Sequence, residues 1–161
     1  MIGILSDSHG RHLAVRQAMQ LFDEHGVEHV VHCGDVGGIP VFDEMLGRPL
    51  TFVFGNMDFP DTPLYAYLEA AGLKAVDGKS PVVRLGGKSL AVFHGHETGF
   101  AKAVDDLAVD YLLHGHTHVM CDERRRTTRM INPGALHRAR VKTVAMLETT
   151  ADRLSFHELA V

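Results

Sequence analysis

The chain has 161 residues, 45% of them hydrophobic and 22% charged, so it is long enough to bury a core and is not of the disordered or low-complexity class. Its formal net charge of −4 argues against broad capture of nucleic acid or of an anionic membrane, because such binding needs a basic surface. With two cysteines, no run long enough for a membrane helix and no signal-peptide pattern at its start, we expect one cytoplasmic domain over residues 1–161.

Apolar runs and amphipathic stretches alternate through the first 60 residues, which predicts a strand, helix, strand rhythm. The expected elements are a strand at Ile2–Leu5, a helix over residues 11–25 capped by Gly26, a strand from Val27 to Val31, a short helix through Phe42–Leu46 and a strand at Leu50–Phe54. Each of the three strands runs directly into polar residues. This pattern is typical of an α/β domain.

Beyond residue 60 the pattern becomes richer in strands. The expected elements are a helix at Pro63–Ala71, a hairpin of Val82–Leu85 and Ser89–Phe93 around Gly86 and Gly87, a helical stretch at Val104–Leu107, and strands at Tyr111–Leu113, Arg129–Ile131, Val141–Leu147 and Leu154–Leu159. We interpret the basic run Arg124–Arg126 as a solvated strand or turn. The whole predicts a layered α/β fold.

Five of the predicted strands are followed by side chains that bind metal ions. These side chains are Asp7 and His9, Asp35, Asn56 and Asp58, His94 and His96, and His116 and His118. Loops beyond the carboxyl ends of the strands converge in α/β sheets, so we expect the side chains to share one site. A mixture of imidazole, carboxylate and amide ligands favours Mn²⁺, Fe²⁺, Ni²⁺ or Zn²⁺ over Mg²⁺ or Ca²⁺.

Five motifs follow one another in a fixed order: Asp-X-His, Gly-Asp, Gly-Asn-X-Asp, His-Gly-His and Gly-His-X-His, the last with Asn-Pro-Gly at 132–134 behind it. This set resembles the calcineurin-like metallophosphoesterase superfamily, and most of all its small bacterial and archaeal phosphodiesterases. The resemblance implies a four-layer α/β/β/α sandwich that carries two divalent cations, Mn²⁺ foremost, with Fe²⁺, Ni²⁺ or Zn²⁺ as alternatives.

The resemblance also implies a role for each motif residue. One cation would be held by Asp7, His9 and His118, the other by Asn56, His94 and His116, with Asp35 bridging both. A hydroxide held between the two cations would then attack a small-molecule phosphate ester, with a diester as the expected substrate.

Two departures from the family pattern affect the catalytic residues. Met57 stands where many members have a histidine that assists the leaving group, and methionine cannot donate a proton. The second acid that often follows Gly34-Asp35 is also missing. We assign catalytic roles to Asn56 and to His96, the latter as a replacement acid, with a surface histidine as the alternative; Asp58 is interpreted as a brace for its loop.

Alternatives from other classes stay open at this point. The superfamily includes a scaffold subunit of a membrane-coat complex, so the fold alone does not establish catalysis. A hydrolase with a single zinc ion would need no bridging carboxylate at Asp35. Exposed edge strands in the tail leave a homodimer open as well.

Overall fold

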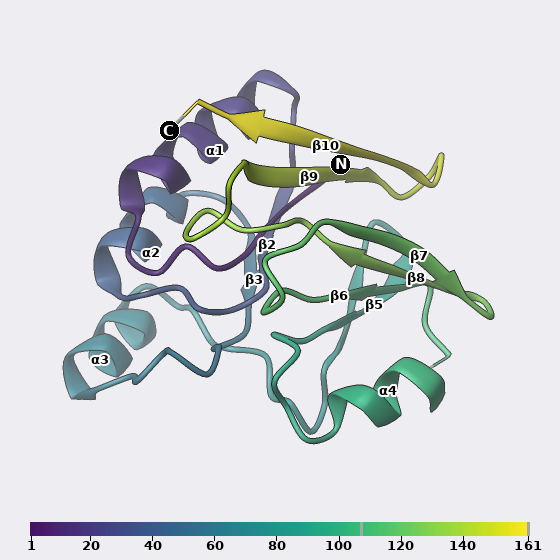
Figure 1. The fold of residues 1–161 in the computed structure, drawn as a ribbon. Coiled ribbons are helices and arrows are strands. Elements are labelled where there is room, and N and C mark those ends of the chain that lie inside the picture. The colour runs from purple at the N-terminus through teal and green to yellow at the C-terminus, as the bar shows by residue number, and fades with distance from the viewer. Residues whose placement is uncertain (107, 161) are drawn as a thin grey trace.

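The computed structural model describes residues 1–106 and 108–160, and over these residues the chain forms two five-stranded sheets and four helices (Figure 1). The strands of the first sheet are, in spatial order, β10 (Arg153–Leu159), β9 (Lys142–Glu148), β1 (Ile2–Leu5), β2 (His29–His32) and β3 (Leu50–Phe52). Those of the second sheet are β4 (Val82–Leu85), β5 (Lys88–Val92), β6 (Tyr111–Leu113), β8 (Thr128–Asn132) and β7 (Cys121–Arg125). The helices are α1 (His12–Glu24), α2 (Ile39–Met45), α3 (Thr62–Ala70) and α4 (Phe100–Asp106).

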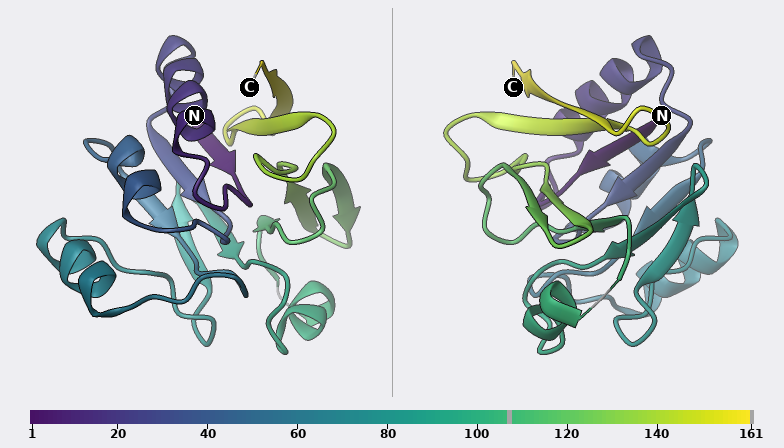
Figure 2. Two further views of the ribbon diagram at one scale, coloured as in Figure 1. Left: turned by 60° about the vertical axis from the view of Figure 1, so that its left-hand side comes forward. Right: turned by 90° about the vertical axis from the view of Figure 1, so that its right-hand side faces the viewer.

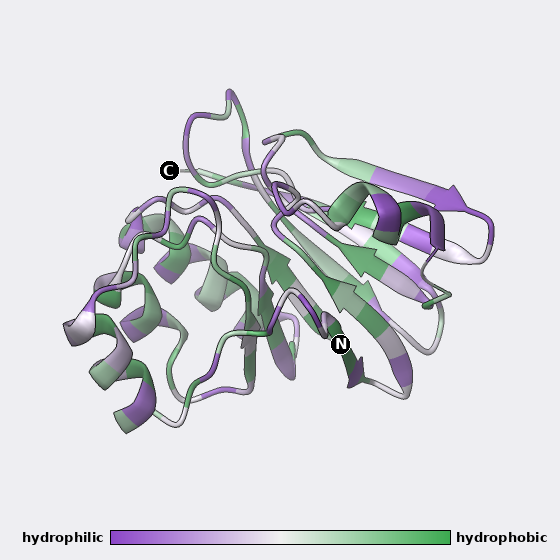
Figure 3. Cartoon of the chain, turned by 90° about the horizontal axis from the view of Figure 1, so that it is seen from below, coloured by the Kyte–Doolittle hydropathy of each residue, from purple (hydrophilic) through white to green (hydrophobic). Residues whose placement is uncertain are grey.

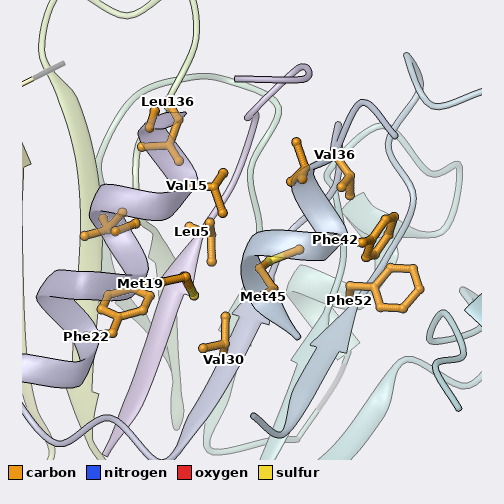
Figure 4. Packing of buried hydrophobic residues seen from close by; sticks show 14 of the residues in the cluster. Leu5, Val15, Met19, Phe22, Val30, Val36, Phe42, Met45, Phe52 and Leu136 are labelled. Carbon is orange, nitrogen blue, oxygen red and sulfur yellow. The ribbon is translucent and has the colours of Figure 1, made fainter. Parts of the chain in front are cut away.

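Helices α1, α2 and α3 cover the outer face of the first sheet (Figure 1, Figure 2). Phe22 of α1 and Phe42 of α2 are completely buried there, and Phe52 of β3 packs edge-on against Phe42 (Figure 4). Gly3 lets Phe22 lie on the strand, since a Cβ at Gly3 would come within 2.6 Å of that ring. Burial of each phenylalanine stabilises the fold by roughly 2 kcal/mol.

A second apolar cluster fills the space between the two sheets. Ile4 and Val31 of the first sheet belong to it, together with Leu113 and Ile131 of the second. A third cluster places Ala103 of α4 on the outer face of the second sheet. The layers therefore run helix, sheet, sheet, helix, which confirms the expected four-layer α/β/β/α sandwich, and the hydropathy of the chain follows it, with green strands inside and purple on the outer faces (Figure 3).

The direction of the strands gives the fold its functional edge. Strands β1, β2 and β3 run parallel, and so do β5, β6 and β8, whereas the remaining strands pair antiparallel. Two parallel trios thus present their carboxyl ends to connecting loops, where ligand sites form in such sheets.

Most elements lie where the sequence predicts them, with their ends shifted by a few residues. Strand β2 begins at His29 rather than Val27, and α2 spans Ile39–Met45 rather than Phe42–Leu46. Strand β3 ends at Phe52 rather than Phe54, and α4 begins at Phe100, before the expected stretch Val104–Leu107, of which residue 107 lies outside the described residues. Strand β7 was expected only as a solvated strand or turn at Arg124–Arg126, because its residues are mostly polar and exposed, and it spans Cys121–Arg125. Arg124 and Arg125 are exposed on β7, in agreement with a solvated strand.

Among the described residues, no helix combines the length and the apolar character that a bilayer crossing would require.

Candidate metal centre

The loops after β1 and β2 stay side by side beyond the sheet. Asp7 donates its backbone N–H to the carbonyl oxygen of Gly34 (3.0 Å), and His9 donates to that of Asp35 (2.8 Å). The parallel pairing of the strands therefore continues into the loops. It brings Asp7, His9 and Asp35 together although the first and the last are 28 positions apart in the sequence.

The loops after β5 and β6 are joined in the same way. The N–H of Gly115 donates to the carbonyl oxygen of His94 (2.9 Å), and the carboxylate of Glu97 accepts the N–H of His94 (2.7 Å). The side-chain amide of Asn132, at the end of β8, donates to the carbonyl oxygen of Gly115 (2.9 Å). Glu97 was not singled out in the sequence, because an acidic residue within a loop carries no pattern of its own.

Asp7, His9 and His118 form the first candidate cluster, with ligand atoms that all lie within 4.8 Å of one another. Asp7 is completely buried, and its Oδ1 lies 3.1 Å from Nε2 of His118. Within the described part of the chain, neither Asp7 Oδ1 nor His9 Nε2 has a hydrogen-bond partner. Buried polar atoms nearly always have a hydrogen-bond partner or another ligand, and a bound cation would be the missing partner of these two atoms.

A second cluster consists of Asp7, Asp35 and His94, and in it Asp35 lies between His94 and His9 of the first cluster. Its Oδ2 lies 3.4 Å from Nε2 of His9 and 3.3 Å from Nε2 of His94. Its other oxygen accepts the N–H of Met57 (2.8 Å), which fixes the carboxylate. One carboxylate oxygen therefore faces an imidazole from each side.

His94 is completely buried and aimed into the site. Its Nδ1 donates to the carbonyl oxygen of Cys33 (2.8 Å), so Nε2 is left to face the ligands. Oδ1 of Asn56 lies 3.1 Å from that Nε2, and the ring of His116 lies 5.0 Å from the ring of His94. The backbone N–H of His116 donates to Asp7 (3.1 Å), which ties its loop to the first cluster.

Five of the predicted site residues have a left-handed backbone, which non-glycine residues rarely adopt. The φ angles are 53° at Asp7, 43° at His9, 53° at Asp35, 68° at His116 and 58° at His118. Each such residue costs about 1–3 kcal/mol, and strain of this kind gathers at functional sites. Among the described residues, eight non-glycine residues have a positive φ and five of them are these, so the strain is concentrated at the site.

Gly55 and Asp58 hold the loop after β3 close to Asp35. A Cβ at Gly55 would lie 2.0 Å from Oδ1 of Asp35, so only glycine allows the two loops to approach. The carboxylate of Asp58 accepts N–H groups from Val36 (3.0 Å), Gly37 (2.9 Å) and Gly55 (2.8 Å). Asp58 thus braces two loops at once.

His32 supports the loops after β1 and β2. It is completely buried; its Nδ1 accepts the N–H of Gly34 (3.2 Å), and its Nε2 lies 2.8 Å from Oγ of Ser8. These partners place the proton on Nε2. Burial lowers the pKa of His32 to about 4, so the ring is neutral near pH 7.

His96, His116 and Asn56 are exposed at the mouth of the site. The ring of His96 lies 5.3 Å from that of His94 and 6.4 Å from that of His116. Among the described histidines, cysteines and acidic residues, only Asp7, His9, Asp35, His94 and His118 enter the two clusters, so the rings of His96 and His116 lie around them. Asn56 Oδ1, at 3.1 Å from Nε2 of His94, lies beside the second cluster.

The residues present fit a pair of divalent cations. Asp7 and Asp35 are buried carboxylates, and over the described residues their charged or titratable contacts are imidazoles, with no arginine or lysine. A buried carboxylate without a positive partner is costly. Carboxylate, imidazole and amide groups around one point are also the ligand set of borderline divalent metals.

The sequence model of the calcineurin-like phosphoesterase superfamily domain matches residues 1–152. The chain therefore belongs to this superfamily of phosphoesterases, whose members act with divalent metals, and the predicted family is confirmed. It is 28% identical over 153 residues to the phosphodiesterase MJ0936 of Methanocaldococcus jannaschii, with 92% of each chain covered. It is 31% identical over 138 residues to the probable metallophosphoesterase MJ0623 of that organism, covering 84% of this chain and 67% of that protein.

Solved structures show the same relationship. An archaeal phosphodiesterase superposes with a TM-score of 0.86 at 26% identity, over 98% of this chain and 99% of the other. Yfce, a phosphoesterase from E. coli, has a TM-score of 0.69 at 22% identity, over 99% and 98%. Vps29 of Entamoeba histolytica with zinc has a TM-score of 0.67 at 20% identity, over 98% and 90%. The last two likenesses are evidence for the fold alone.

Proposed function

We propose that residues 1–161 form one dinuclear-metal phosphodiesterase domain. Two divalent cations, when bound, supply a hydroxide near neutral pH and neutralise charge on the phosphate ester. The observation that carries the proposal is the pair of buried carboxylates, Asp7 and Asp35, which imidazoles surround and which have no arginine or lysine partner among the described residues.

The proposed ligands divide into two sets that share one residue. The first set is Asp7, His9 and His118, the second is Asn56, His94 and His116, and Asp35 bridges them. The position of Asp35 Oδ2, within 3.4 Å of His9 and 3.3 Å of His94, supports the bridging role. The mixed donor set favours Mn²⁺, with Fe²⁺, Ni²⁺ and Zn²⁺ as alternatives.

The chain itself positions the substrate and moves one proton. Asn56 turns its Oδ1 toward His94, which leaves its amide nitrogen to donate to a phosphate oxygen. We assign the protonation of the leaving oxygen to His96, because Met57 cannot donate a proton and His96 is exposed beside His94. The backbone carbonyl of Cys33 keeps the His94 ring in the orientation that the site needs.

Hydrolysis of bis-p-nitrophenyl phosphate and of p-nitrophenyl phosphate tests this function. The chain is treated with a chelator, and Mn²⁺, Ni²⁺, Zn²⁺ or Mg²⁺ is then added back one at a time. We expect Mn²⁺ to restore hydrolysis, with the diester preferred over the monoester. Metal binding without turnover of either compound would contradict the proposal.

A scaffold function is the second candidate. Met57 and Phe59, on the loop after β3, are 55% and 80% exposed and present an apolar surface beside the site, as an interaction partner would require. The fold that the chain shares with Vps29 is compatible with this function. The same assay separates the candidates, because a scaffold would bind metal and hydrolyse nothing. The homodimer and the cytoplasmic location stay predictions of the sequence.

A further inference from the structure

A groove of about 800 Å³ lies beside the proposed centre, between the start of α1 and the segment of residues 136–142. Gly10 lines it, directly after His9 in the sequence. The ring of His137, also in its wall, lies 5.1 Å from the ring of His9. The groove therefore adjoins the first ligand set, on the side of His9.

The walls of the groove carry positive charge that no carboxylate compensates. Arg11, Arg138 and Lys142 line it, and within the described residues none of them forms an ion pair. Other arginines of the chain, such as Arg16 and Arg48, are each paired with a carboxylate. An excess of cations here is a local feature, because the whole chain has a net charge of −4.

The sequence keeps acidic residues out of both walls. No aspartate or glutamate occurs in residues 8–22 or in residues 124–147, the two ranges within which the lining residues lie. Glu44 approaches the rim, where it lies 3.5 Å from Nδ1 of His12, but Arg16 binds it with two hydrogen bonds of 2.7 and 3.0 Å. The charge of Glu44 is thus already matched outside the groove.

The cations are placed where an anion could reach several of them. Nε of Arg11 donates to Nδ1 of His137 (3.3 Å), which orients the guanidinium and leaves its terminal nitrogens for another acceptor. Helix α1 has no side-chain cap and no acidic residue in its first turn, so its N-terminus adds partial positive charge. Leu13, 58% exposed, supplies an apolar wall in the same groove.

We propose that this groove binds a second phosphate group, carried on one ester arm of the substrate. Guanidinium groups bind phosphate oxygens through paired hydrogen bonds, and Lys142 adds a point charge. The substrate class is then a phosphodiester with a further phosphate a few bonds from the scissile one, as in a nucleoside bisphosphate ester, with the carbon skeleton against Leu13. This inference rests on the proposed function, since the metal centre must hold the scissile phosphate.

The test compares the p-nitrophenyl ester of thymidine 5′-phosphate with the same ester bearing a 3′-phosphate. We expect kcat/KM to be about tenfold higher for the ester with the extra phosphate, the effect of two exposed charge pairs, and the ratio to shrink with added salt. The double variant Arg138→Gln/Lys142→Gln should lower the ratio well below tenfold, although Arg11 remains in the groove. Lys102→Gln/Arg125→Gln, with the same charge loss at exposed positions on α4 and β7, should keep the tenfold ratio. A ratio near one in the unmodified chain, or one that survives the double variant, would overturn the inference.

Binding measurements keep the groove testable if neither ester is hydrolysed, an outcome that would contradict the proposed function alone. Calorimetry then compares thymidine 3′,5′-bisphosphate with thymidine 5′-phosphate. Tighter binding of the bisphosphate, lost in Arg138→Gln/Lys142→Gln and retained in the control, supports the groove; equal binding of the two compounds overturns it. A sugar bisphosphate and a short oligothymidylate are then tested as competitors of the thymidine bisphosphate, and competition by either supports the groove. Competition by the sugar bisphosphate indicates a small-molecule source of the phosphate, and competition by the oligothymidylate indicates a nucleic acid.

Discussion

Arg129 and its neighbours form one cluster of charged side chains in this chain, and the candidate metal centre forms another. The guanidinium of Arg129 donates to both carboxylate oxygens of Asp122 (2.7 and 2.8 Å) and to Oδ1 of Asp152 (2.8 Å). Arg124 binds Asp152 as well. At the metal centre, by contrast, imidazoles surround the buried carboxylates of Asp7 and Asp35.

The two clusters differ in whether their charges are balanced by other residues of the chain. Hydrogen bonds from Arg129 lower the pKa of Asp122 and of Asp152, and those bonds in turn raise the pKa of Arg129, so each group stabilises the charge of the others. Such a cluster needs no ligand to balance its charges. The metal centre is buried, strained and without compensating cations among the described residues, so it needs a positive partner that the chain does not supply.

Asp35→Asn should produce the largest effect, because it removes the carboxylate that lies between His9 and His94. Loss of a residue that only orients a metal ligand lowers metal affinity or activity about 10–100-fold. We therefore expect loss of a bridging ligand to lower kcat/KM by more than about 100-fold. Metal content should fall with it. Hydrolysis of bis-p-nitrophenyl phosphate and elemental analysis measure the two effects, and an active variant with its metals retained would refute the bridging role.

Arg129→Ala tests the other cluster and should act on the fold alone. It leaves Asp122 and Asp152 without their common partner, and the Arg129 side chain is only 12% exposed. We expect the free energy of unfolding to drop by about 2–3 kcal/mol, near the lower limit for a broken buried pair, since both carboxylates are partly solvated. Urea unfolding measures the loss, with the exposed Arg125→Ala as the control. A fall in metal content at unchanged stability would mean that the two clusters are not independent.

His32→Gln should reduce the pH dependence of stability in the metal-free chain. The folded pKa of His32 is about 4, below its ordinary value of 6.5, so between these limits the unfolded chain binds more protons. Stability is therefore complete above pH 6.5 and is lost as the pH falls toward 4. We expect His32 to contribute about 2 kcal/mol of the loss between pH 7 and pH 5. Urea midpoints with chelator at both pH values should differ less in the variant; equal differences in the two chains would argue against a neutral buried His32.

His96→Ala should have the smallest effect and should separate proton donation from metal binding. His96 is exposed and lies outside the two clusters formed by the described residues, so metal content should not change. We expect kcat to fall roughly tenfold, less than the 10²–10⁴ of a well-placed acid. Esters whose leaving groups differ in acidity provide the control, because an ester with a good leaving group needs little protonation and should be affected least. An equal loss on all esters would assign His96 a structural role.

The sequence predicts a layered α/β domain and the convergence of the site because both depend on short-range pattern, whereas the four-layer arrangement followed from the family resemblance. Apolar runs of four or five residues, such as Ile2–Leu5, mark buried strands, and a polar residue directly after each run marks the functional edge. Strand β7 could not be found in this way, since it is polar and exposed and is a strand only through its pairing with β8.

The geometry within the site lies beyond a single sequence. The residue types of Asp7 and His118 do not predict a left-handed backbone. Contacts with the surrounding structure impose that conformation. The role of Glu97 as an acceptor for the N–H groups of His94 and Gly95 depends likewise on a loop whose shape is set by tertiary contacts. The ligand and catalytic assignments stay predictions, although the structure brings the side chains of Asp7, His9, Asp35, His94 and His118 within reach of one another.

The number of ions bound per chain is the most direct test of a two-cation centre. The unmodified chain, His118→Ala and His94→Ala are each dialysed to equilibrium against Mn²⁺ and analysed for metal. We expect about two ions in the unmodified chain and about one in each variant, because each histidine belongs to a different ligand set. One ion in the unmodified chain, or a count that neither substitution changes, would contradict it.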